Sequence, residues 1–373
     1  MVKLEGLKAT NDTGSGSLVR SRVAVLKTSP QTVLKDIGLA MNLAEYREVL
    51  SRDITTLLKV NISWQHYYPA CSTSPWQLDG VIRALISDGY TDLIPTHNGT
   101  VVVNAKEGQL NNKHKNVEDV HSLNDMHLEE VKWVRYKPKN KLLVLDKIYE
   151  DGIYIPEPLI GKNIVHLPTM KTHVFTTVTG AMKNAFGGLL NQKRHWTHSV
   201  IHETLVDLLQ IQKEIHPGIF AVMDGTFAGS GPGPRAMEWH EKNIIIAGSD
   251  QVAVDAVSAS MMGFDPMSIK FIRLAHEMGL GCGDLAAIDV LGEDISEVNW
   301  GFKSDNTFAS RGQKLIYWGP LKPLENILLR SKFTPWAYLA SNLYHNQYWL
   351  RFVGRKRVRR AMNTGWGALF RKY

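Results

Sequence analysis

The segment KTHVFTTVTGAMKNAFGGLLNQKRHWTH, residues 171–198, concentrates positive and titratable side chains among glycines. It carries Lys171, His173, Lys183 and His195, and it contains no acidic residue. A purely structural segment does not need unneutralised cations, so this pattern favours a site for a negatively charged ligand. In such a site the positive charge of the lysines would stabilise a negative charge that develops during a reaction. His173 or His195 would transfer a proton as a general acid or base.

The stretch TGAMKNAFGG, residues 179–188, places glycines on both sides of Lys183. Glycine lets backbone N–H groups approach an anion closely. A desolvated lysine can neutralise a phosphate or carboxylate, or act as a base or nucleophile. The spacing is neither GxxxxGK[ST] nor GxGxxG, so neither common phosphate-binding loop is present. We take Thr179 and Gly187 as candidate substrate-binding positions.

Three histidines follow at spacings that would place them on one helix face. His195, His198 and His202 stand at i, i+3 and i+7, and imidazole nitrogens arranged in this way can hold a divalent metal. The same side chains could instead titrate near neutral pH as general acids or bases, or form a polar helix face without a ligand. Because no HExxH motif accompanies them, the sequence favours acid–base or anion contact over a metal.

The stretch DGTFAGSGPGP, residues 224–234, is expected to be a loop that follows a strand, with Asp224 at the sheet edge. Gly229, Gly231 and Gly233 would give this loop backbone freedom. A loop that covers a ligand and a plain structural turn both fit the composition. Under the first alternative Asp224 is a catalytic residue and Gly231 a substrate-binding one.

Apolar runs and amphipathic stretches alternate along the chain, and these elements must position the candidate residues. The expected strands are 21–27, 54–64, 91–99, 131–137, 141–145, 163–171, 220–225 and 243–250. The expected helices are 30–50, 74–90 and 202–216. The second helix has Ser74 as its N-cap and Pro75 at its first position. The alternation predicts an α/β fold with a mostly parallel sheet and helices on both faces.

Polar side chains stand at the ends of several expected strands. Lys59 and Asn61 end one strand, Lys171 and His173 another, and Asp224 a third. In open α/β sheets ligands bind outside the carboxyl ends of the strands. One such lysine would usually be solvated, but their joint occurrence favours a shared electropositive hollow for a small anionic ligand.

The composition excludes several classes of protein. Two cysteines, Cys71 and Cys282, cannot build a disulfide framework or an iron–sulfur cluster within one chain. Cys282, which stands between glycines, is either a reactive thiol or inert packing. The N-terminal residues lack the apolar run of a signal peptide, and no apolar stretch is long enough to span a membrane. We expect a cytoplasmic protein.

The C-terminal residues differ in kind from the rest. No acidic residue follows Glu325, and the ten positive residues there leave a net charge of about −3 for the remainder of the +7 chain. These residues are Arg330, Lys332, Arg351, Arg355, Lys356, Arg357, Arg359, Arg360, Arg371 and Lys372. Aromatic residues accompany them, namely Trp336, Tyr344, Tyr348, Trp349, Trp366 and Phe370.

This composition is typical of a segment that contacts anionic lipid, so 330–373 would bind the inner face of a membrane. A helix packed on the body with a solvated basic end is an equal alternative. Nucleic acid is less favoured, because no recognised motif accompanies the charge. We divide the chain into a flexible N-terminus (1–20), an α/β domain of one or two lobes (21–310) and a basic, aromatic C-terminal helical extension (311–373).

In their order, these motifs resemble the bacterial and archaeal family named only as domain of unknown function 362. The matching stretches include LLKVN, CSTSPWQLDGVIRAL, PTMKTH, TGAMKNAFGG, MDGTFAGSGPGP and AGSDQVAVDAVSASMMGFDP. The resemblance implies a shared site at Lys59, Asn61, Lys171, His173, Lys183, Asn184 and Asp224. Many relatives carry a ferredoxin-like insert with cysteine clusters, which this sequence lacks, so no iron–sulfur cluster is expected.

A looser resemblance, to the catalytic domain of the nickel-pincer lactate racemases, lies in a glycine-flanked lysine followed by histidines. By analogy it suggests isomerase-like or hydrolase-like chemistry, and it assigns no cofactor. Two functions follow from the sequence. One is an enzyme that acts on a small carboxylate or phosphate, with or without a divalent metal, and the other is a non-catalytic protein held at a membrane surface. The residues define neither the substrate nor the oligomeric state.

Overall fold

The structure is a computed structural model that describes residues 20–99, 103–325 and 342–373. Most of the expected flexible segment 1–20 therefore lies outside the described residues. Arg330, Lys332 and Trp336 of the C-terminal extension lie outside them too.

Within the described residues, one ten-stranded sheet organises the fold, in the order β12-β1-β11-β10-β7-β2-β3-β4, with β8 and β9 attached at β10. Its strands are β1 (Ser21–Lys27), β2 (Thr56–Val60), β3 (Leu93–His97), β4 (Met126–His127), β7 (Asn163–Leu167), β8 (Thr169–His173), β9 (Thr177–Val178), β10 (Ile219–Ser230), β11 (Glu238–Gly248) and β12 (Ile288–Gly292). Of these described strands, β11 runs antiparallel to its neighbours β1 and β10, and β9 antiparallel to β8. The other pairs are parallel, as expected for an α/β fold. Apart from this sheet, β5 (Trp133–Tyr136) pairs antiparallel with β6 (Ile153–Pro156).

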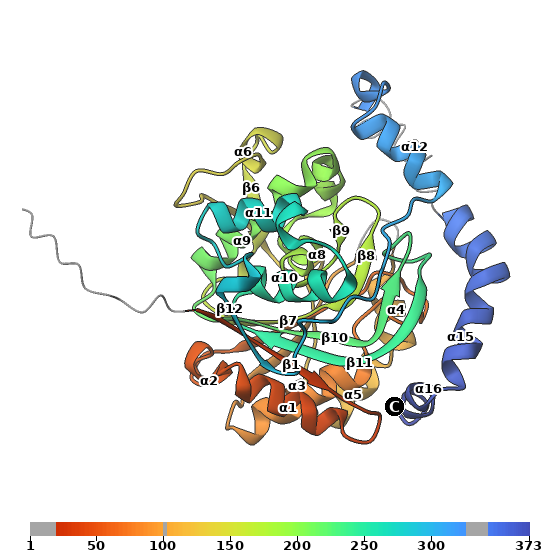
Figure 1. Ribbon diagram of the computed structural model, residues 1–373. Helices are drawn as coiled ribbons and strands as arrows, with labels where there is room; N and C mark the ends of the chain where they lie inside the picture. Colours follow the sequence, from red (N-terminus) through yellow and green to blue (C-terminus); the bar gives the residue numbers. More distant parts are fainter. Residues whose placement is uncertain (1–19, 100–102, 326–341) are drawn as a thin grey trace, which may run out of the picture.

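Helices cover both faces of the sheet, as the strand and helix alternation predicts (Figure 1). The α-helices are α1 (Val33–Leu43), α2 (Tyr46–Val49), α3 (Pro75–Ser87), α4 (Ala105–Asn111), α5 (His114–Val120), α6 (Leu145–Ile148), α7 (Ala181–Asn184), α8 (Phe186–Leu189), α9 (Ile201–Ile215), α10 (Gln251–Met262), α11 (Lys270–Glu277), α12 (Phe308–Tyr317), α15 (Arg355–Met362) and α16 (Gly365–Phe370). Single 3₁₀ segments are η1 (Glu157–Leu159), η2 (Gln192–Val200), η3 (Pro266–Ser268), η4 (Leu285–Ala287) and η5 (Lys322–Leu324), and η6 (Leu343–Gly354) is a π-helix.

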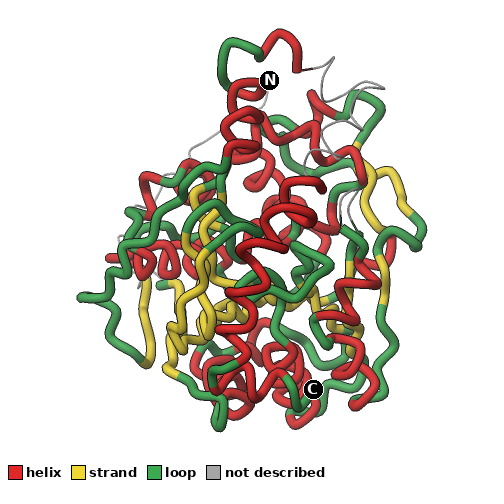
Figure 2. The backbone as a smooth tube through the Cα atoms, turned by 90° about the vertical axis from the view of Figure 1, so that its right-hand side faces the viewer, coloured by secondary structure: helices red, strands yellow, loops and turns green. Residues whose placement is uncertain are grey.

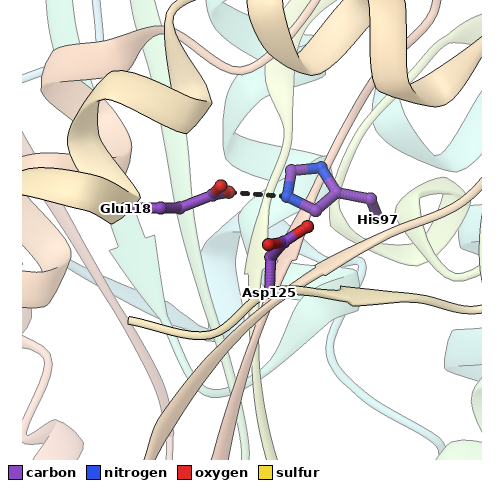
Figure 3. Close-up of side chains that lie close together, drawn as sticks. All are labelled: His97, Glu118 and Asp125. Carbon is purple, nitrogen blue, oxygen red and sulfur yellow. Dashed lines mark hydrogen bonds and ion pairs between the residues drawn. The ribbon is translucent and has the colours of Figure 1, made fainter. Parts of the chain in front are cut away.

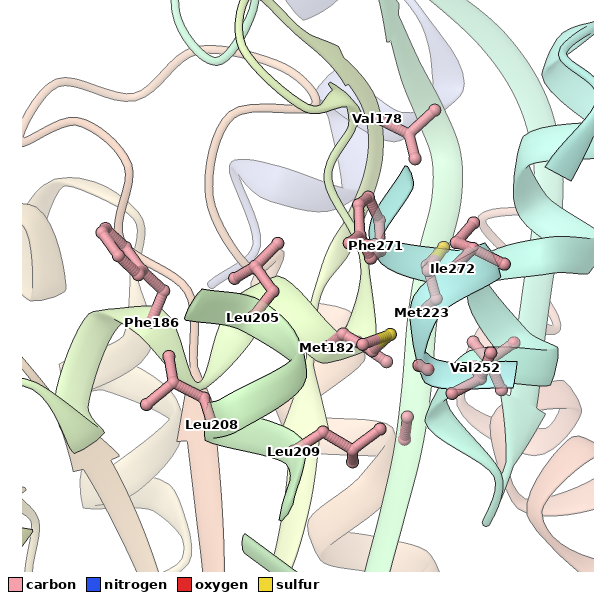
Figure 4. Close-up of a cluster of buried hydrophobic side chains, with 14 of the residues drawn as sticks. Val178, Met182, Phe186, Leu205, Leu208, Leu209, Met223, Val252, Phe271 and Ile272 are labelled. Carbon is pink, nitrogen blue, oxygen red and sulfur yellow. The ribbon is translucent and has the colours of Figure 1, made fainter. Parts of the chain in front are cut away.

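Two hydrophobic cores result, because successive strand side chains point to opposite faces. In β11, for example, Ile244 and Ile246 pack into the core under α9, α10 and α11, whereas Ile245 packs into the core over α1 and α3. Figure 4 shows part of the first core, where Met182, Leu205 and Phe271 come from three different helices. The two cores lie between the sheet and its two helical layers. Polar residues can therefore gather at the carboxyl ends of the parallel strands, outside both cores.

Helix α3 begins where the sequence places it, and the reason is local. Ser74 Oγ accepts a hydrogen bond from Gln77 N, while the Gln77 side chain accepts from Ser74 N, which is a capping box. Pro75 occupies the first helical position, where a missing N–H costs nothing. Ser74 Oγ also donates to Asp224 Oδ2 at 2.5 Å, so this cap joins α3 to β10.

The expected loop at 224–234 is wrong over most of its length, because β10 continues to Ser230. The glycines serve close packing between strands. A Cβ on Gly229 would lie 2.6 Å from Sδ of Met237, and a Cβ on Gly225 would lie 3.2 Å from the carbonyl oxygen of Ile244. A register shift between Gly225 and Phe227 bends the strand, as a β-bulge does.

The expected strand at 141–145 is also wrong. Backbone N–H groups of Leu143, Val144 and Leu145 donate to the carboxylate of Asp207 at 2.7, 2.9 and 3.0 Å. The side chain of an α9 residue therefore satisfies donors that a neighbouring strand would otherwise pair. Leu145 then begins α6.

The C-terminal extension packs against the body from Leu343 to the end of the chain (Figures 1 and 2). Trp349, Trp366 and Phe370 are buried in the core shared with α1 and α3. The indole N–H of Trp366 donates to Asn243 Oδ1 at 2.7 Å, and its ring lies 5.1 Å from that of Trp76. Half of the expected aromatic set therefore serves tertiary packing.

None of the helices in the described parts of the chain is long and apolar enough to cross a lipid bilayer.

Replacing Ser74 with alanine removes the N-cap of α3 and the hydroxyl that donates to buried Asp224. We expect Ser74→Ala to lower the free energy of unfolding by about 2–4 kcal/mol, from a lost cap and a carboxylate left without that donor. Urea denaturation measures the change. Ser87→Ala, at an exposed position near the other end of α3, should cost less than about 0.5 kcal/mol. Equal losses in the two variants would contradict the role of Ser74.

Candidate functional site

The end of β2 directs Lys59 to the side of the sheet that α8 and α9 cover. The side chain is buried, and its Nζ donates to the carbonyl oxygen of Val60 at 2.6 Å and to Oδ1 of Asn98 at 2.8 Å. Both acceptors are uncharged, so the ammonium exchanges its hydration shell for neutral groups. Burial, with a smaller effect from nearby Arg194, lowers the pKa of Lys59 to about 7.

Lys171 on β8 is buried beside Asn61, as the strand-end pattern anticipates. Lys171 Nζ donates to the carbonyl oxygen of Cys71 at 2.8 Å and to Thr169 Oγ1 at 2.5 Å. Asn61 Nδ2 donates to the same two oxygens, at 3.1 and 3.4 Å. Thr179 closes this group, because its backbone N–H donates to the carbonyl oxygen of Lys171 at 2.9 Å. Burial lowers the pKa of Lys171 to about 8.

Lys183 lies half-buried on the short helix α7, with its Nζ 5.3 Å from the centroid of the Phe186 ring. The guanidinium of Arg194 lies 6.0 Å from the same ring. Burial first, and then the charges of Lys171 and Arg194, lower the pKa of Lys183 to about 7. A lysine with such a pKa is only partly protonated at neutral pH. It can therefore serve as an acid, a base or a nucleophile.

A buried carboxylate fixes the start of α7. Asp255 accepts hydrogen bonds from the backbone N–H groups of Ala181 at 2.6 Å and Met182 at 3.1 Å. Gly180 makes this approach possible, because a Cβ there would lie 1.9 Å from Asp255 Oδ1. Burial raises the pKa of Asp255 to about 7. The glycine before Lys183 is thus needed for the position of the lysine.

His173 ends β8 and is buried beside the lysines. Its Nδ1 accepts a hydrogen bond from the backbone N–H of Phe175 at 3.1 Å, so the ring proton of the neutral imidazole resides on Nε2. Burial, together with Lys183 and His198, lowers the pKa of His173 well below its usual value. His173 is therefore an uncharged hydrogen-bond donor near the lysines, rather than a base that titrates at neutral pH.

Aromatic rings enclose His198. Its ring stacks on Tyr317 with 5.8 Å between centroids and meets Phe175 and Phe186 edge-on at 5.7 and 5.6 Å. Its Nδ1 contacts the carbonyl oxygen of His195 at 3.0 Å. Burial lowers the pKa of His198 to about 4. His198 is therefore uncharged at neutral pH, and the charge of nearby Lys183 contributes to this.

Lys59, Lys171, Lys183 and Arg194 form what we call the cationic cluster. The positive charges of Lys171 and Arg194 both lower the pKa of Lys183. The charge of Arg194 also lowers the pKa of Lys59. The four side chains come from β2, β8, α7 and η2, at the carboxyl end of the parallel strands. Among the described residues, the ion pairs within 4.0 Å involve other cations. The cluster therefore carries positive charge that the described carboxylates do not pair.

The glycine-rich turn after α7 packs directly on Lys59. Gly188 has φ of +145°, and a Cβ there would lie 2.8 Å from Cε of Lys59. A Cβ on Gly187 would lie 3.0 Å from Oδ1 of Asn98. Asn184 Nδ2 donates to the carbonyl oxygen of Lys59 at 2.8 Å. The expected positions Asn184 and Gly187 thus border Lys59.

A cavity of about 300 Å³ borders the cationic cluster at Arg194. Asn98, Glu129 and Arg194 are among its lining residues. Lys59 contacts the wall of this cavity through Asn98, whose Oδ1 accepts a hydrogen bond from Lys59 Nζ. The volume suits a small ligand, in the lower range of known binding pockets.

Two of the expected site residues make their hydrogen bonds to groups other than the cationic side chains. Asp224 faces the start of α3, where it accepts from Ser74 Oγ at 2.5 Å and from Thr226 N at 2.7 Å. Gly231, with φ of +106°, turns the chain after β10, and its carbonyl oxygen accepts from Thr172 Oγ1 at 2.7 Å. Asp224 therefore links β10 to α3, and Gly231 links the end of β10 to β8.

The three histidines considered for a metal follow a 3₁₀ segment into α9 rather than one α-helical face. Within the described chain, the His, Cys, Asp and Glu donors that gather within 4.8 Å of one another in a group of three are His97, Glu118 and Asp125. His195, His198 and His202 do not form such a group. His202 instead stacks on Phe271, with 5.9 Å between ring centroids.

Sequence reasoning missed Asn98, Arg194 and Glu129. Asn98 follows the strand end of β3, by the same rule that selected Lys59 and Asn61. Arg194 stands within the cationic segment itself. No local sequence pattern marks Glu129 as a site residue. The fold brings it close to Gly99, whose backbone N–H donates a hydrogen bond to its carboxylate at 2.8 Å.

A family model described as "Domain of unknown function (DUF362)" matches residues 56–260, more than half of the chain. The chain therefore belongs to this family. A thylakoid-associated protein of Synechocystis sp. is 27% identical over 121 residues, which cover 31% of this chain and 37% of that protein. The chain thus spans well under half the length of this relative. No solved structure is similar enough to match.

The lowered lysine pKa values make stability depend on pH. Between about pH 7 and about pH 10 the unfolded chain binds more protons than the folded one, so stability rises with pH over this range. Urea denaturation in a buffer of weakly binding anions at about pH 7 and about pH 9.5 measures the rise.

Lys59→Met removes one lysine from this titration, so its stability should rise with pH by about 1–3 kcal/mol less than that of the unaltered protein. Lys213→Met, at an exposed position in α9, should leave the rise unchanged. A Lys59→Met protein with the full rise would show that Lys59 titrates as in water.

Proposed function

We propose that the chain binds a small carboxylate or phosphate at the cationic cluster and that Lys183 exchanges a proton with this ligand. The observation that carries the proposal is the burial of Lys171 and the half-burial of Lys183, which Lys171 and Arg194 both repel, without a described carboxylate in ion-pair range. Burying unpaired charge costs several kcal/mol. An anionic ligand would supply the missing partner and offset this cost.

Each group has a role that follows from its contacts. Lys171 is held by neutral oxygens and would contribute fixed positive charge. His173 carries its proton on Nε2 and would donate a hydrogen bond to an anionic oxygen. Lys183 and Lys59 each have a pKa of about 7 and can change protonation at neutral pH, and of the two it is Lys59 whose Nζ is held by Val60 and Asn98. Acid–base catalysis is most effective when the pKa of the group lies near the working pH.

Such a set suits proton transfer next to a carboxylate or phosphate, because the developing negative charge would meet preorganised cations in a water-poor site. The side chains support an enzyme whose substrate is a small anion. A divalent metal in this site would need ligands beyond the three histidines, which do not converge.

Lys183 variants test both binding and proton exchange. Isothermal titration with inorganic phosphate, pyrophosphate and malonate, in buffers of different ionisation enthalpy, measures affinity and proton uptake together. We expect binding with proton uptake near pH 7.5, and affinity that falls as pH rises and Lys183 loses its charge. Lys183→Met should weaken binding at least tenfold, which is about 1.4 kcal/mol.

Lys183→Arg is the matched variant, because arginine keeps the charge and does not titrate. It should bind the anion with much less proton uptake. Lys213→Met controls for the loss of a surface charge. If Lys183→Met binds each probe as the unaltered protein does, the cationic cluster is not the anion site.

A second proposal concerns the C-terminal extension as a contact with an anionic membrane surface. Tyr348 and Phe352 in η6 are 58% and 72% exposed, and their ring centroids lie 5.5 Å apart. Arg351 and Arg355 are exposed beside them. Exposed aromatic rings next to basic residues are typical of segments that lie in a lipid interface. This proposal depends on the exposed face and not on the name of the Synechocystis relative.

Packing divides the basic residues into two groups. Arg357 and Arg360 pair with Glu238 on the body of the protein. Arg351, Arg355, Lys356 and Arg359 are exposed, and none of them takes part in the ion pairs found among the described residues. The second group is therefore free to attract anionic lipid, at roughly 1 kcal/mol per residue near the surface.

Vesicle flotation tests this contact with the full chain. Vesicles of phosphatidylcholine with added phosphatidylglycerol should carry the protein, and salt or neutral vesicles should release it. Tyr348→Ser with Phe352→Ser should reduce binding at least about tenfold. Leu39→Ser with Leu43→Ser, a matched exposed pair on α1, should not. Absence of the unaltered protein from the floated anionic vesicles would contradict the proposal.

A further inference from the structure

A second polar cluster lies behind the cavity, where α5, β3 and β4 meet. His97 Nε2 lies 2.7 Å from Glu118 Oε1, and one ligand atom from each of His97, Glu118 and Asp125 lies within 4.8 Å of the other two (Figure 3). His97 and Glu118 are completely buried. Figure 3 shows the Glu118 carboxylate pointing at the imidazole edge, with the Asp125 carboxylate directly below. Three side chains thus direct donor atoms to one small region.

Gln109 holds the two carboxylates in this arrangement. Its Nε2 donates to Glu118 Oε2 at 2.5 Å and to Asp125 Oδ2 at 3.0 Å. A single amide thus bridges two carboxylates that would otherwise repel each other. Such a bridge leaves the other Glu118 oxygen, Oε1, facing His97. Outer hydrogen bonds that fix the orientation of carboxylates are typical of metal sites.

The charges within this cluster are incompletely balanced. Glu118 has His97 as its ion-pair partner among the described residues, and His97 is charged only when protonated. Asp125 has His127 at 3.1 Å and Lys115 at 3.6 Å. A fully buried carboxylate beside a second carboxylate calls for a cation. His97 Nδ1 and His127 Nδ1 are, in addition, buried without a hydrogen-bond partner.

We propose that His97 Nε2, Glu118 and Asp125 bind a divalent first-row transition metal ion, a site distinct from the cationic cluster. One imidazole with carboxylates suits Zn²⁺, Mn²⁺ or Fe²⁺ rather than a soft ion that prefers sulfur. His127 is within reach as a further ligand through Nε2, which lies beside Asp125. The Asp125 side chain is 20% exposed, so an ion can enter from that side.

The local fold gives such an ion a structural task. Strand β4 has two residues, and its pairing with β3 sets Thr96 opposite Met126 and His97 opposite His127. Helix α5 has seven residues. Elements this short gain little stability of their own. An ion bound by β3, α5 and the segment before β4 would tie all three together.

The metal site would also position the cavity wall. Asn98, which accepts the Lys59 hydrogen bond, follows His97 directly, and Leu128 and Glu129 follow His127. Loss of the ion should therefore loosen the end of β3 on which Asn98 sits.

Metal titration of the full chain after chelator treatment tests the site. We expect one equivalent of Zn²⁺ or Co²⁺ to bind, with visible Co²⁺ absorption bands and a rise in Tm on Zn²⁺ addition. Asp125→Asn keeps size and hydrogen bonding, so it should fold and bind at least tenfold more weakly.

His202→Gln is the matched control, because it removes a histidine outside the cluster and should leave metal binding unchanged. Failure of the unaltered protein to bind an equivalent of either ion would overturn the proposal. So would binding that Asp125→Asn leaves intact, or that His202→Gln removes.

Discussion

The removal of lysine ammonium groups from water is the constraint on which the site depends. Lys59 and Lys171 are fully buried and Lys183 is half-buried, and the acceptors of the first two are carbonyl, amide or hydroxyl oxygens. Neutral acceptors compensate less of the lost hydration than a carboxylate would. The fold must therefore be stable enough elsewhere to hold these groups, and its two cores on either side of the sheet provide that stability.

Three buried or half-buried carboxylates serve the backbone instead. Asp207 accepts from three consecutive N–H groups before α6, Asp255 from two at the start of α7, and Asp250 from Val252, Ala253 and Cys282. Each of these carboxylates fixes a helix start or a turn. These three carboxylates are thus engaged by peptide dipoles and not by the buried lysines. The cationic cluster therefore stays able to attract an external anion.

The sequence predicted the α/β class and most strands, because hydrophobic alternation and turn residues are local signals. Ser74 and Pro75 show this best, since the start of α3 depends on residues within one helical turn. The failures involve distant partners. The glycines at 224–234 read as a loop in the sequence, because the close approaches that they permit come from Met237, just before β11, and from Ile244 within β11. The strand expected at 141–145 does not form, because its backbone N–H groups bond to the carboxylate of Asp207 and not to a neighbouring strand. Asp207 lies more than sixty residues away in the sequence.

The same distinction applies to the site. Lysines at strand ends were visible in the sequence, and the parallel sheet brings Lys59 and Lys171 to one edge. Asp224 satisfied the same rule, and yet its contacts are with Ser74 at the start of α3 and with Thr226. Its register partner on β8 is Thr169, which binds Lys171, so Asp224 shares a face of the sheet with Lys171. The rule finds the end of the strands, and the local partners of each side chain decide what it contacts.

The alternation of side chains along a strand explains how two polar clusters can occupy the end of one strand without merging. His97 and Asn98 are neighbours, so their side chains point to opposite sides of the chain. His97 meets Glu118 of α5, whereas Asn98 meets Lys59 of β2. An acidic cluster and a basic one thus lie back to back with one peptide unit between them. Any force that fixes the backbone of His97 fixes Asn98 as well, and so the geometry of Lys59 depends on a cluster that it never touches.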